Sequence, residues 1–425
     1  MNETLNNAAA QMTAALADPA GVPSHPVIFL VLGVVTFALH IAAVAVLLGS
    51  TGLALYARMK GGEMWNRLGS TMAFTAKAAT GAAIVLGVAP LLFVQVIYDP
   101  FWYATSMLSA VWTIIFLAVL VIAYLALYRV HALLHAEHGA GSSGGAVFWL
   151  AAAFVLFLGA GTIMHMLANQ ALFPTHWLAW YAPAGAADAS GMQFNGVLIP
   201  RLLFFFSLAL PVTSAWIYGM RRFVLSKAHY DNQADGPYSD FLEVVAERMA
   251  LWGGILVAVT GAAWMLMLPA EQSWFLTSIW PWLALIAVLF FLALPVIEKK
   301  RRLCVPCNYL VFVMVVVMTA LLASAREALR LGTLLETSAW NPLGLTINWD
   351  VPTTAIFFVT FLVVGGTALA YILISAWNAG LATAGSKDAV WEPSAKLESL
   401  GKWAAGLLGL WIAGYFVVGA VVALG

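Results

Sequence analysis

Two histidines stand inside strongly apolar stretches of the sequence. His40 follows Thr-Phe-Ala-Leu, and His165 follows Gly-Thr-Ile-Met. An ionisable side chain is costly within hydrocarbon, so such a residue indicates a function. Two neutral imidazoles that project into one helical bundle can bind the iron of a b-type haem from opposite faces. We therefore predict haem b with His40 and His165 as iron ligands. Met164 or Met166 as the second ligand, or two histidines bonded only to neighbouring helices, are the alternatives.

Three arginines occur at the ends of apolar stretches where no other basic residue is found. They are Arg201, Arg326 and Arg330, and the last two share a helix face at i,i+4 spacing with Glu327 beside them. Guanidinium forks bind carboxylates, so these arginines are predicted to bind the cofactor through haem propionates. An internal glutamate, a quinone head group and the polar surface of the membrane are the alternative partners.

Two further patterns carry weaker predictions. His131, His135 and His138 have helical spacing that can hold a metal, but a solvated helix end is the favoured interpretation. Cys304-Val-Pro-Cys307 is a C-x-x-C motif without the following histidine that attachment of a c-type haem requires. A cysteine pair at the membrane interface is favoured there over a redox dithiol or a metal site.

Composition and hydropathy predict the elements that carry these residues. Of the 425 residues 63% are hydrophobic and 9% are charged, against about 25% charged in an ordinary soluble domain. A soluble fold and disorder are excluded, and a net charge of zero without a basic run argues against binding nucleic acid. Ten apolar runs are long enough to cross a lipid bilayer as helices. They cover about 26–57, 71–98, 104–128, 147–172, 197–220, 249–269, 275–297, 305–329, 352–376 and 401–424.

The distribution of basic residues predicts the orientation. All of the 19 lysines and arginines except Arg201, Arg326 and Arg330 lie in or next to one set of loops, which the positive-inside rule assigns to the cytoplasm. Ten crossings then place both termini outside. Residues 1–24 carry no lysine or arginine, and residues 4–17 are predicted to form a short helix on the outer face. We expect a multi-pass protein of a bacterial-type inner membrane, with the lipid bilayer as its surroundings.

Short matches, four apolar runs apart, indicate an internal repeat. Trp102-Tyr-Ala-Thr-Ser106 matches Trp274-Phe-Leu-Thr-Ser278, Ala79-Thr-Gly81 matches Val259-Thr-Gly261, and Ala168-Asn-Gln-Ala-Leu172 matches Ala325-Arg-Glu-Ala-Leu329. We therefore predict an all-α integral membrane fold of two tandem four-helix bundles plus two extra helices. The segments are an outer N-terminal segment (1–24), the first bundle (25–172), the second bundle (197–330) and two additional helices (352–425).

Parts of the sequence resemble subunit I of the cytochrome bd-type quinol oxidases. Phe37-Ala-Leu-His40 followed by Val46-Leu-Leu-Gly49 resembles the first helix of that family. The approach to the second apolar run, Trp65-Asn-Arg-Leu68 and Phe74-Thr-Ala-Lys-Ala-Ala-Thr-Gly81, and the segment Pro200-Arg-Leu-Leu-Phe-Phe205 are similar to it as well. The resemblance implies two four-helix bundles with an extra helix, an outside N-terminus and a haem-ligating His40.

The chain also departs from the family pattern. Residues 202–206 contain no second histidine ligand, a short Pro269–Ser273 link replaces the long loop for quinol oxidation, and the third run lacks acidic residues. Only His40 is therefore implied as a ligand by the resemblance. We expect an electron-transfer subunit of a respiratory complex that binds haem b, interacts with quinone, or both. Its expected partners are other subunits and a cytochrome c on the outer face. A cofactor-free quinone-interacting subunit of the NrfD type, a scaffold subunit and a membrane transporter are the alternatives.

Overall fold

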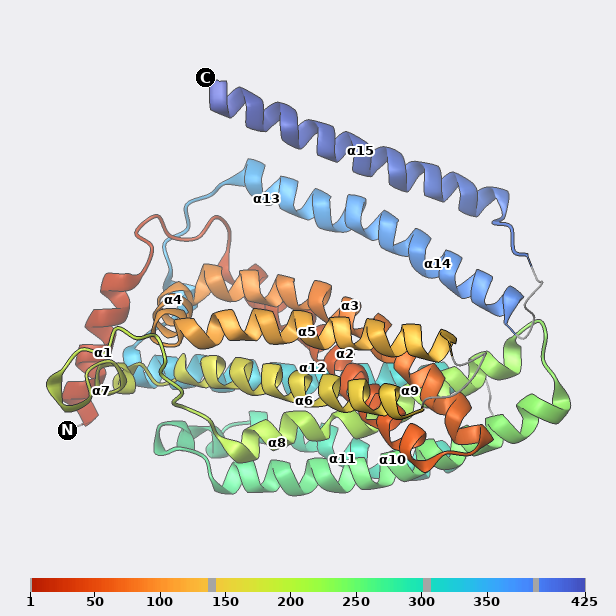
Figure 1. Ribbon diagram of the computed structural model, residues 1–425. Coiled ribbons are helices and arrows are strands. Elements are labelled where there is room, and N and C mark those ends of the chain that lie inside the picture. The colour runs from red at the N-terminus through yellow and green to blue at the C-terminus, as the bar shows by residue number, and fades with distance from the viewer. Residues whose placement is uncertain (1, 137–142, 301–306, 385–389, 425) are drawn as a thin grey trace. The chain divides into compact units, whose positions relative to one another are not determined.

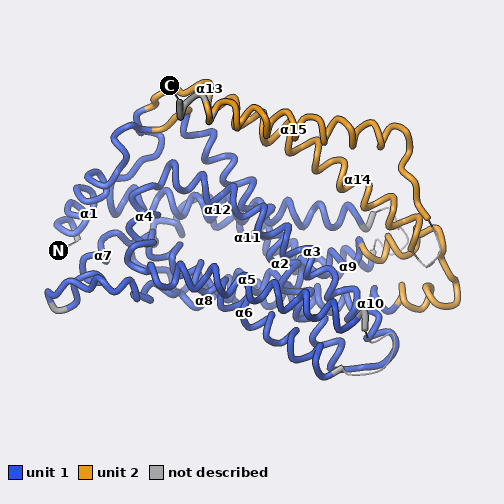
Figure 2. The backbone as a smooth tube through the Cα atoms, turned by 45° about the horizontal axis from the view of Figure 1, so that its top comes forward, with its two compact units in different colours: residues 1–21, 25–219, 241–346 blue, residues 22–24, 220–240, 347–425 orange. Residues whose placement is uncertain are grey.

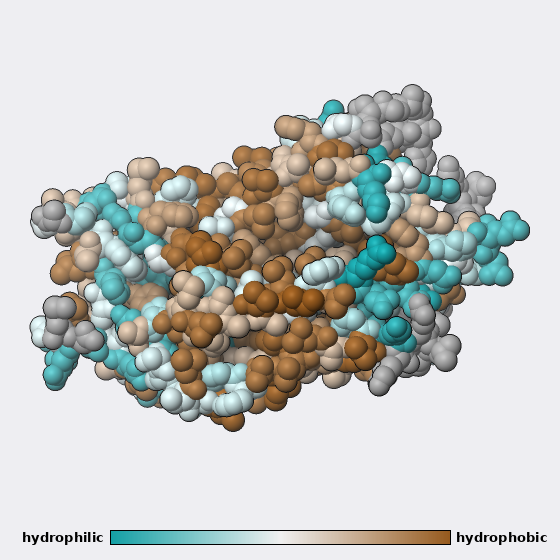
Figure 3. Space-filling model, turned by 90° about the horizontal axis from the view of Figure 1, so that it is seen from below, coloured by the Kyte–Doolittle hydropathy of each residue, from teal (hydrophilic) through white to brown (hydrophobic). Residues whose placement is uncertain are grey.

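The computed structural model describes residues 2–136, 143–300, 307–384 and 390–424. These residues are helical and contain no β-strand beyond an isolated bridge between Val22 and Ile347. Ten of their helical segments are long and apolar enough to cross a membrane. On the face drawn in Figure 3, hydrophobic residues form a broad central band and hydrophilic residues gather toward the ends. The all-α, multi-span fold predicted from hydropathy is confirmed.

The helices of the first half are α1 (Asn2–Leu16), α2 (Pro26–Lys60), α3 (Glu63–Ile97), α4 (Asp99–Leu108), α5 (Ala110–Ala136) and α6 (Ser143–Gln170). Three short elements follow, η2 (Pro174–His176), α7 (Trp177–Tyr181) and η3 (Pro183–Gly185). The next helices are α8 (Ile199–Ser207), α9 (Ala209–Ser226), α10 (Asn232–Leu266), η4 (Ala270–Thr277), α11 (Trp280–Lys300) and α12 (Cys307–Ser338). The last elements are η5 (Pro342–Gly344), α13 (Val351–Phe358), the π-helical η6 (Val359–Gly365), α14 (Gly366–Thr383) and α15 (Ala395–Leu424).

The chain divides into two compact units, which Figure 2 shows in different colours. Unit 1 consists of Met1–Gly21, His25–Gly219 and Phe241–Thr346, and unit 2 of Val22–Ser24, Met220–Asp240 and Ile347–Gly425. Most of the sequence of both predicted four-helix bundles belongs to unit 1. The two additional predicted helices belong to unit 2.

Within unit 1, α2 joins two groups of helices. It packs against α3 and α6, which also contact α5, and it packs against α12 as well. Helices α8 to α12 share a buried apolar core that includes Val257, Phe291 and Val315. Ala45 and Val46 of α2 reach this same core. The long helices of unit 1 run side by side (Figure 1), so α2 is in a position to carry residues that face both groups.

Local sequence defines the ends of α2. The Nδ1 atom of His25 accepts the Val27 N–H at 3.3 Å, and Pro26 occupies the first turn, where a missing N–H is tolerated. At the other end Gly61 and Gly62 have φ values of 69° and 89°, a backbone conformation that favours glycine. The chain therefore reverses directly into α3, which returns along α2.

Several helices are longer than the apolar runs that predicted them. Helices α2, α3 and α10 each contain 35 residues, which at about 1.5 Å per residue exceeds the thickness of the hydrocarbon core. Hydropathy marks only the part of a helix that matches hydrocarbon, so α10 begins well before residue 249. The Trp102–Ser106 segment lies in the separate helix α4 rather than opening α5. The predicted helix at residues 4–17 is confirmed as α1.

Unit 2 is built mainly from α14 and α15, which pack against each other. The helix before α14 widens into the π-helical η6, and the Trp411 Nε1–H of α15 donates to the Thr360 hydroxyl there at 2.7 Å. Most of the side chains of both helices are exposed and apolar, as expected for segments that face lipid.

Candidate functional site

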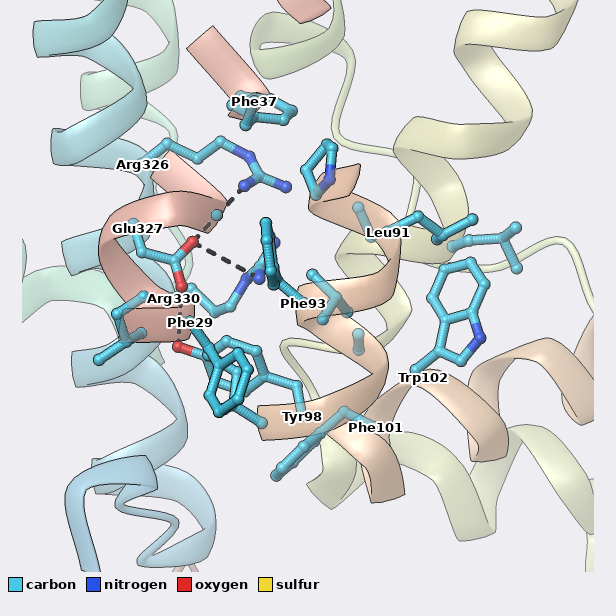
Figure 4. A pocket seen from close by; sticks show the side chains of 18 of the residues that line it. Phe29, Phe37, Leu91, Phe93, Tyr98, Phe101, Trp102, Arg326, Glu327 and Arg330 are labelled. Atoms are coloured by element: carbon cyan, nitrogen blue, oxygen red, sulfur yellow. Dashed lines mark hydrogen bonds and ion pairs between the residues drawn. The ribbon is translucent and has the colours of Figure 1, made fainter. Parts of the chain in front are cut away.

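Three charged side chains from one helix meet inside unit 1. Arg326, Glu327 and Arg330 of α12 are 12%, 13% and 13% exposed. The Glu327 Oε2 atom lies 3.7 Å from Arg326 Nη1 and 3.5 Å from Arg330 Nη1, and its Oε1 atom accepts the Tyr98 hydroxyl at 2.8 Å (Figure 4). This group is the most polar part of the wall of a cavity among α2, α3, α4, α6 and α12.

Aromatic rings complete the surroundings of the two arginines. The Arg326 guanidinium lies over the Phe37 ring, with its Cζ atom 4.1 Å from the ring centroid, and Arg330 lies over the Tyr98 ring at 4.9 Å. Such stacking holds each guanidinium by its flat face and leaves its N–H edges directed in the plane of the group. The Tyr98 hydroxyl is the donor in its bond to Glu327, because a carboxylate oxygen only accepts.

His40 lines the same cavity from α2. Its Nδ1 atom is 2.9 Å from the Ala83 carbonyl oxygen. A carbonyl only accepts, so Nδ1 carries the proton in the neutral ring and Nε2 is left as an acceptor. A β-carbon on Gly87 would lie 2.8 Å from both the Cε1 and Nδ1 atoms of His40, so α3 leaves room for the imidazole only because residue 87 is glycine. The sequence thus fixes both the orientation and the tautomer of His40.

The remainder of the cavity wall is apolar and largely aromatic, and its volume is about 140 Å³. The aromatic residues that line it include Phe29, Phe37, Phe93, Phe101 and Trp102 (Figure 4). A buried cavity of about 150 Å³ takes up one benzene molecule. The cavity therefore has the size of one six-membered ring, with polar groups at part of its wall.

His165 lies in a different environment, on α6. It is not among the residues that line the cavity. Its Nε2 atom accepts the Leu198 N–H at 3.2 Å, and Asn169 Nδ2 is 3.5 Å away. Asn169 also accepts a hydrogen bond from Arg201 and donates to the Gly196 carbonyl at 2.7 Å. The predicted ligand His165 therefore already belongs to a network of hydrogen bonds within the protein.

His40 lines the cavity and His165 does not, so the two predicted iron ligands do not share this cavity. The alternative ligand Met164 does line the cavity with His40, whereas Met166 is buried in an apolar cluster. A haem has four pyrrole rings, and the cavity has the volume of one ring. Haem ligation by His40, with Met164 or His165, stays a prediction.

The structure brings all five predicted cofactor-binding residues into one electrostatic neighbourhood. His40, Arg326 and Arg330 line the cavity, and Arg201 interacts electrostatically with Arg330 and Arg326. His165 interacts electrostatically with Arg201 and Arg326 but does not line the cavity.

Most residues of the two weaker predictions, the histidine group and the C-x-x-C motif, lie outside the part of the chain whose side chains the structure describes. His138 and Cys304 lie outside the described residues, and the side chains of His135 and Cys307 are not described. The His131 ring contacts Phe74, with 6.2 Å between centroids. No group of three metal-binding side chains occurs among the residues that the structure describes.

The sequence analysis did not predict three residues that act at or next to the site, namely Tyr98, Gly87 and Asn169. Tyr98 is one of many aromatic residues near helix ends, a feature typical of membrane interfaces, so its residue type carries no signal. Gly87 is far from His40 in sequence. The internal repeat offered one usable signal, because it aligns Asn169 with Arg326 and Gln170 with Glu327, and Asn169 binds Arg201.

No protein-family model matches the chain, and no curated sequence is significantly similar to it. The fold defines it as a multi-pass helical membrane protein, and conclusions about its function rest on the cavity in unit 1.

Proposed function

We propose that the chain is a quinone-interacting subunit of a membrane electron-transfer complex, with the cavity in unit 1 as the site for the quinone head group. The observation that carries this proposal is a ring-sized aromatic cavity whose wall contains both strong hydrogen-bond donors and strong acceptors. Sites for small ligands usually combine an apolar lining with a few placed polar groups.

The polar residues match the needs of both oxidation states. A bound quinone supplies reversible two-electron, two-proton chemistry. Arg326 and Arg330 can donate hydrogen bonds to carbonyl oxygens. Glu327 and the Nε2 atom of His40 can accept hydrogen bonds from hydroxyl groups and hold the protons that these groups release. The ring walls, among them Phe93 and Trp102, stack on a flat ligand and exclude water.

Electron exchange at this site requires a second redox centre, which we assign to a partner protein. Helix α1 packs on α12 and α4 at the end of unit 1 near Tyr98. The segments at that end contain no lysine or arginine. They carry the carboxylates of Glu3, Asp18, Asp99, Asp188, Glu271 and Glu336. Such a surface favours a basic soluble partner, for which a c-type cytochrome is our candidate.

Photoaffinity labelling tests the site directly. The full chain in detergent is illuminated with an azido-benzoquinone, and the labelled peptides are identified by mass spectrometry. We expect the label on the helices that line the cavity, α2, α3, α4, α6 or α12. We expect Phe93→Trp, which fills the cavity, to reduce the labelling at least tenfold. Phe148→Trp, on an exposed position of α6, is the matched control. A label that is confined to other helices, or is unchanged in Phe93→Trp, would overturn the proposal.

A reduced-minus-oxidised absorption spectrum of the same preparation tests the haem prediction separately. A haem b band that disappears in His40→Ala but persists in His165→Ala would identify His40 as an iron ligand, and a haem site would then replace the quinone site proposed here.

A further inference from the structure

The described part of unit 1 holds an excess of positive charge next to the cavity. Arg201, Arg326 and Arg330 contribute three positive charges, and Glu327 contributes one negative charge, which leaves an excess of two. Glu327 is the one carboxylate that the described interactions place beside these arginines. Arginine stays protonated in proteins, so the excess persists across ordinary pH.

Arg201 makes this excess unusual because it is buried without a counter-charge among the residues that the structure describes. It is 4% exposed. Its guanidinium donates to the neutral amide of Asn169, its Cζ atom lies 5.5 Å from the centroid of the Trp264 ring, and its Nε–H has no hydrogen-bond partner. Arg201 comes from α8, and its field adds to that of the two arginines of α12.

We propose that the cavity prefers a ring ligand that carries a negative charge, of the acidic hydroxyquinone class, over a neutral quinone of the same size. This inference rests on the proposed function, since it concerns the same cavity. An ionised hydroxyl next to a quinone carbonyl presents two oxygens in one plane, which matches the paired N–H groups of a guanidinium.

The physical reason for this preference is that the three arginines are held close together where water screens their charges poorly. Arg326 and Arg330 share one carboxylate at 3.7 and 3.5 Å, distances longer than those of a tight ion pair, so hydrogen-bonding capacity remains on both groups. Buried charges interact more strongly than exposed ones because water does not screen them. An anion in the cavity reduces the repulsion among all three arginines, and a neutral ring does not.

Two probes of matched size test the charge preference in the wild-type chain. Tetramethyl-1,4-benzoquinone is neutral, and 2-hydroxy-3,5,6-trimethyl-1,4-benzoquinone carries an ionised hydroxyl at pH 7 in place of one methyl group. Their ring carbons are all substituted, so neither adds readily to a cysteine. Equilibrium dialysis against the detergent-solubilised full chain measures both dissociation constants. We expect the anion to bind at least tenfold more tightly, and expect the preference to vanish at a pH low enough to protonate its hydroxyl.

Substitutions then assign the preference to the arginines. Arg326→Gln and Arg201→Gln should each lower the ratio of the two dissociation constants at least threefold, and Arg326→Lys, which keeps the charge, should retain most of it. Arg129→Gln removes an exposed arginine of α5 as a control and should leave the ratio unchanged. Thermal unfolding of each variant reports whether it is folded.

The outcomes separate this inference from the function on which it rests. Equal binding of the two probes, or tighter binding of the neutral one, would overturn the charge preference and leave the quinone site in place. A preference that survives both Gln substitutions would overturn its assignment to the arginines. Failure of both probes to bind the folded wild-type chain would count against the quinone site itself.

Discussion

His40 and His165 differ in whether they line the cavity, although each has one ring nitrogen bonded within the protein. Both residues lie in apolar helices of unit 1, and each has an arginine in its electrostatic neighbourhood. The Nε2 atom of His165 accepts a backbone N–H, and Asn169 bonds the adjacent Arg201. The Nδ1 atom of His40 bonds to Ala83, while the rest of the ring lines a cavity that Arg326, Glu327 and Arg330 also line.

This difference separates a structural histidine from a candidate ligand-binding one. A buried polar atom that is left without a partner costs free energy, so most polar atoms inside proteins are bonded within the protein. His165 follows this rule with its Nε2 atom. His40 also bonds one ring nitrogen within the protein, but it lines a cavity, where a ligand can bond the other nitrogen.

The strongest test of the comparison is to remove the one carboxylate at the cavity. Glu327→Ala leaves Arg326 and Arg330 without their counter-charge and Tyr98 without its acceptor. Breaking a buried ion pair by removing one partner costs about 3 kcal/mol or more. We expect a loss of stability of this size, measured by chemical unfolding of the detergent-solubilised protein.

Glu336→Ala on the same helix is the control, since Glu336 is exposed and contacts Asn6 through its backbone oxygen. Its effect should stay within about 0.5 kcal/mol. Equal effects of the two substitutions would show that the Glu327 cluster is not held by charge.

The two histidines should respond in opposite ways to truncation. His165→Ala leaves the partly buried N–H of Leu198 without an acceptor, which costs about 1 kcal/mol of stability, and it should leave the binding of tetramethyl-1,4-benzoquinone unchanged. His40→Ala should change stability less and weaken that binding about tenfold. Calorimetric unfolding and equilibrium dialysis measure the two effects. Loss of probe binding in His165→Ala alone would reverse the roles assigned to the two residues.

The sequence predicted the membrane class and singled out three ionisable residues that line the cavity, for a definable physical reason. Hydropathy identifies spans because a helix must match the thickness of hydrocarbon. The rarity of charge in that setting was enough to single out His40, Arg326 and Arg330, all of which line the cavity. The same rule also selected His165, because a costly residue type is evident from sequence whether or not its hydrogen bonds are satisfied.

Three-dimensional contacts between distant segments supplied what the sequence could not. Tyr98 reaches Glu327 across 229 positions of the chain, and Gly87 makes room for His40 across the turn between α2 and α3. No periodicity or motif in the sequence marks either contact. Cavity size likewise depends on how whole side chains interlock, so the sequence left haem and quinone open as alternatives.

A methyl group on Gly87 should disturb the cavity without removing any polar atom. The new Cβ would lie 2.8 Å from two atoms of the His40 ring, so the ring must move away from Ala83 or into the cavity. Overpacking of this kind costs about 1–3 kcal/mol. We expect Gly87→Ala to weaken probe binding about tenfold by equilibrium dialysis. Gly81→Ala on the same helix, whose Cβ would make an ordinary contact at 3.5 Å, is the control. Equal loss of probe binding in both variants would show that any added methyl group on α3 weakens binding and that the contact with His40 is not the cause.

The balance between burial and hydrogen bonding predicts two opposite pH dependences for carboxyl groups at the end of unit 1 near Tyr98. Burial raises the pKa of Asp99, although the Asp18 N–H donates to its Oδ2 atom at 2.7 Å. The stability that this group contributes is full below its ordinary pKa and is lost as the pH rises through the higher folded-state pKa. Asp99→Asn should therefore equal the wild type in acid and be more stable near pH 7, by less than about 1 kcal/mol because the group is partly exposed.

Asp188 provides the opposite case. Hydrogen bonds from Ser190 lower its pKa, and the Ser190 N–H donates to its Oδ1 atom at 2.9 Å. Its contribution is present above the ordinary pKa and is lost as the pH falls through the lower folded-state value, so Asp188→Asn should be less stable than the wild type near pH 7 and approach it in acid. Thermal unfolding of both variants between pH 3 and about pH 8 measures the two trends, in the range where carboxyl groups titrate. Parallel trends would show that hydrogen bonding, rather than burial, decides the protonation state of Asp99, as it does for Asp188.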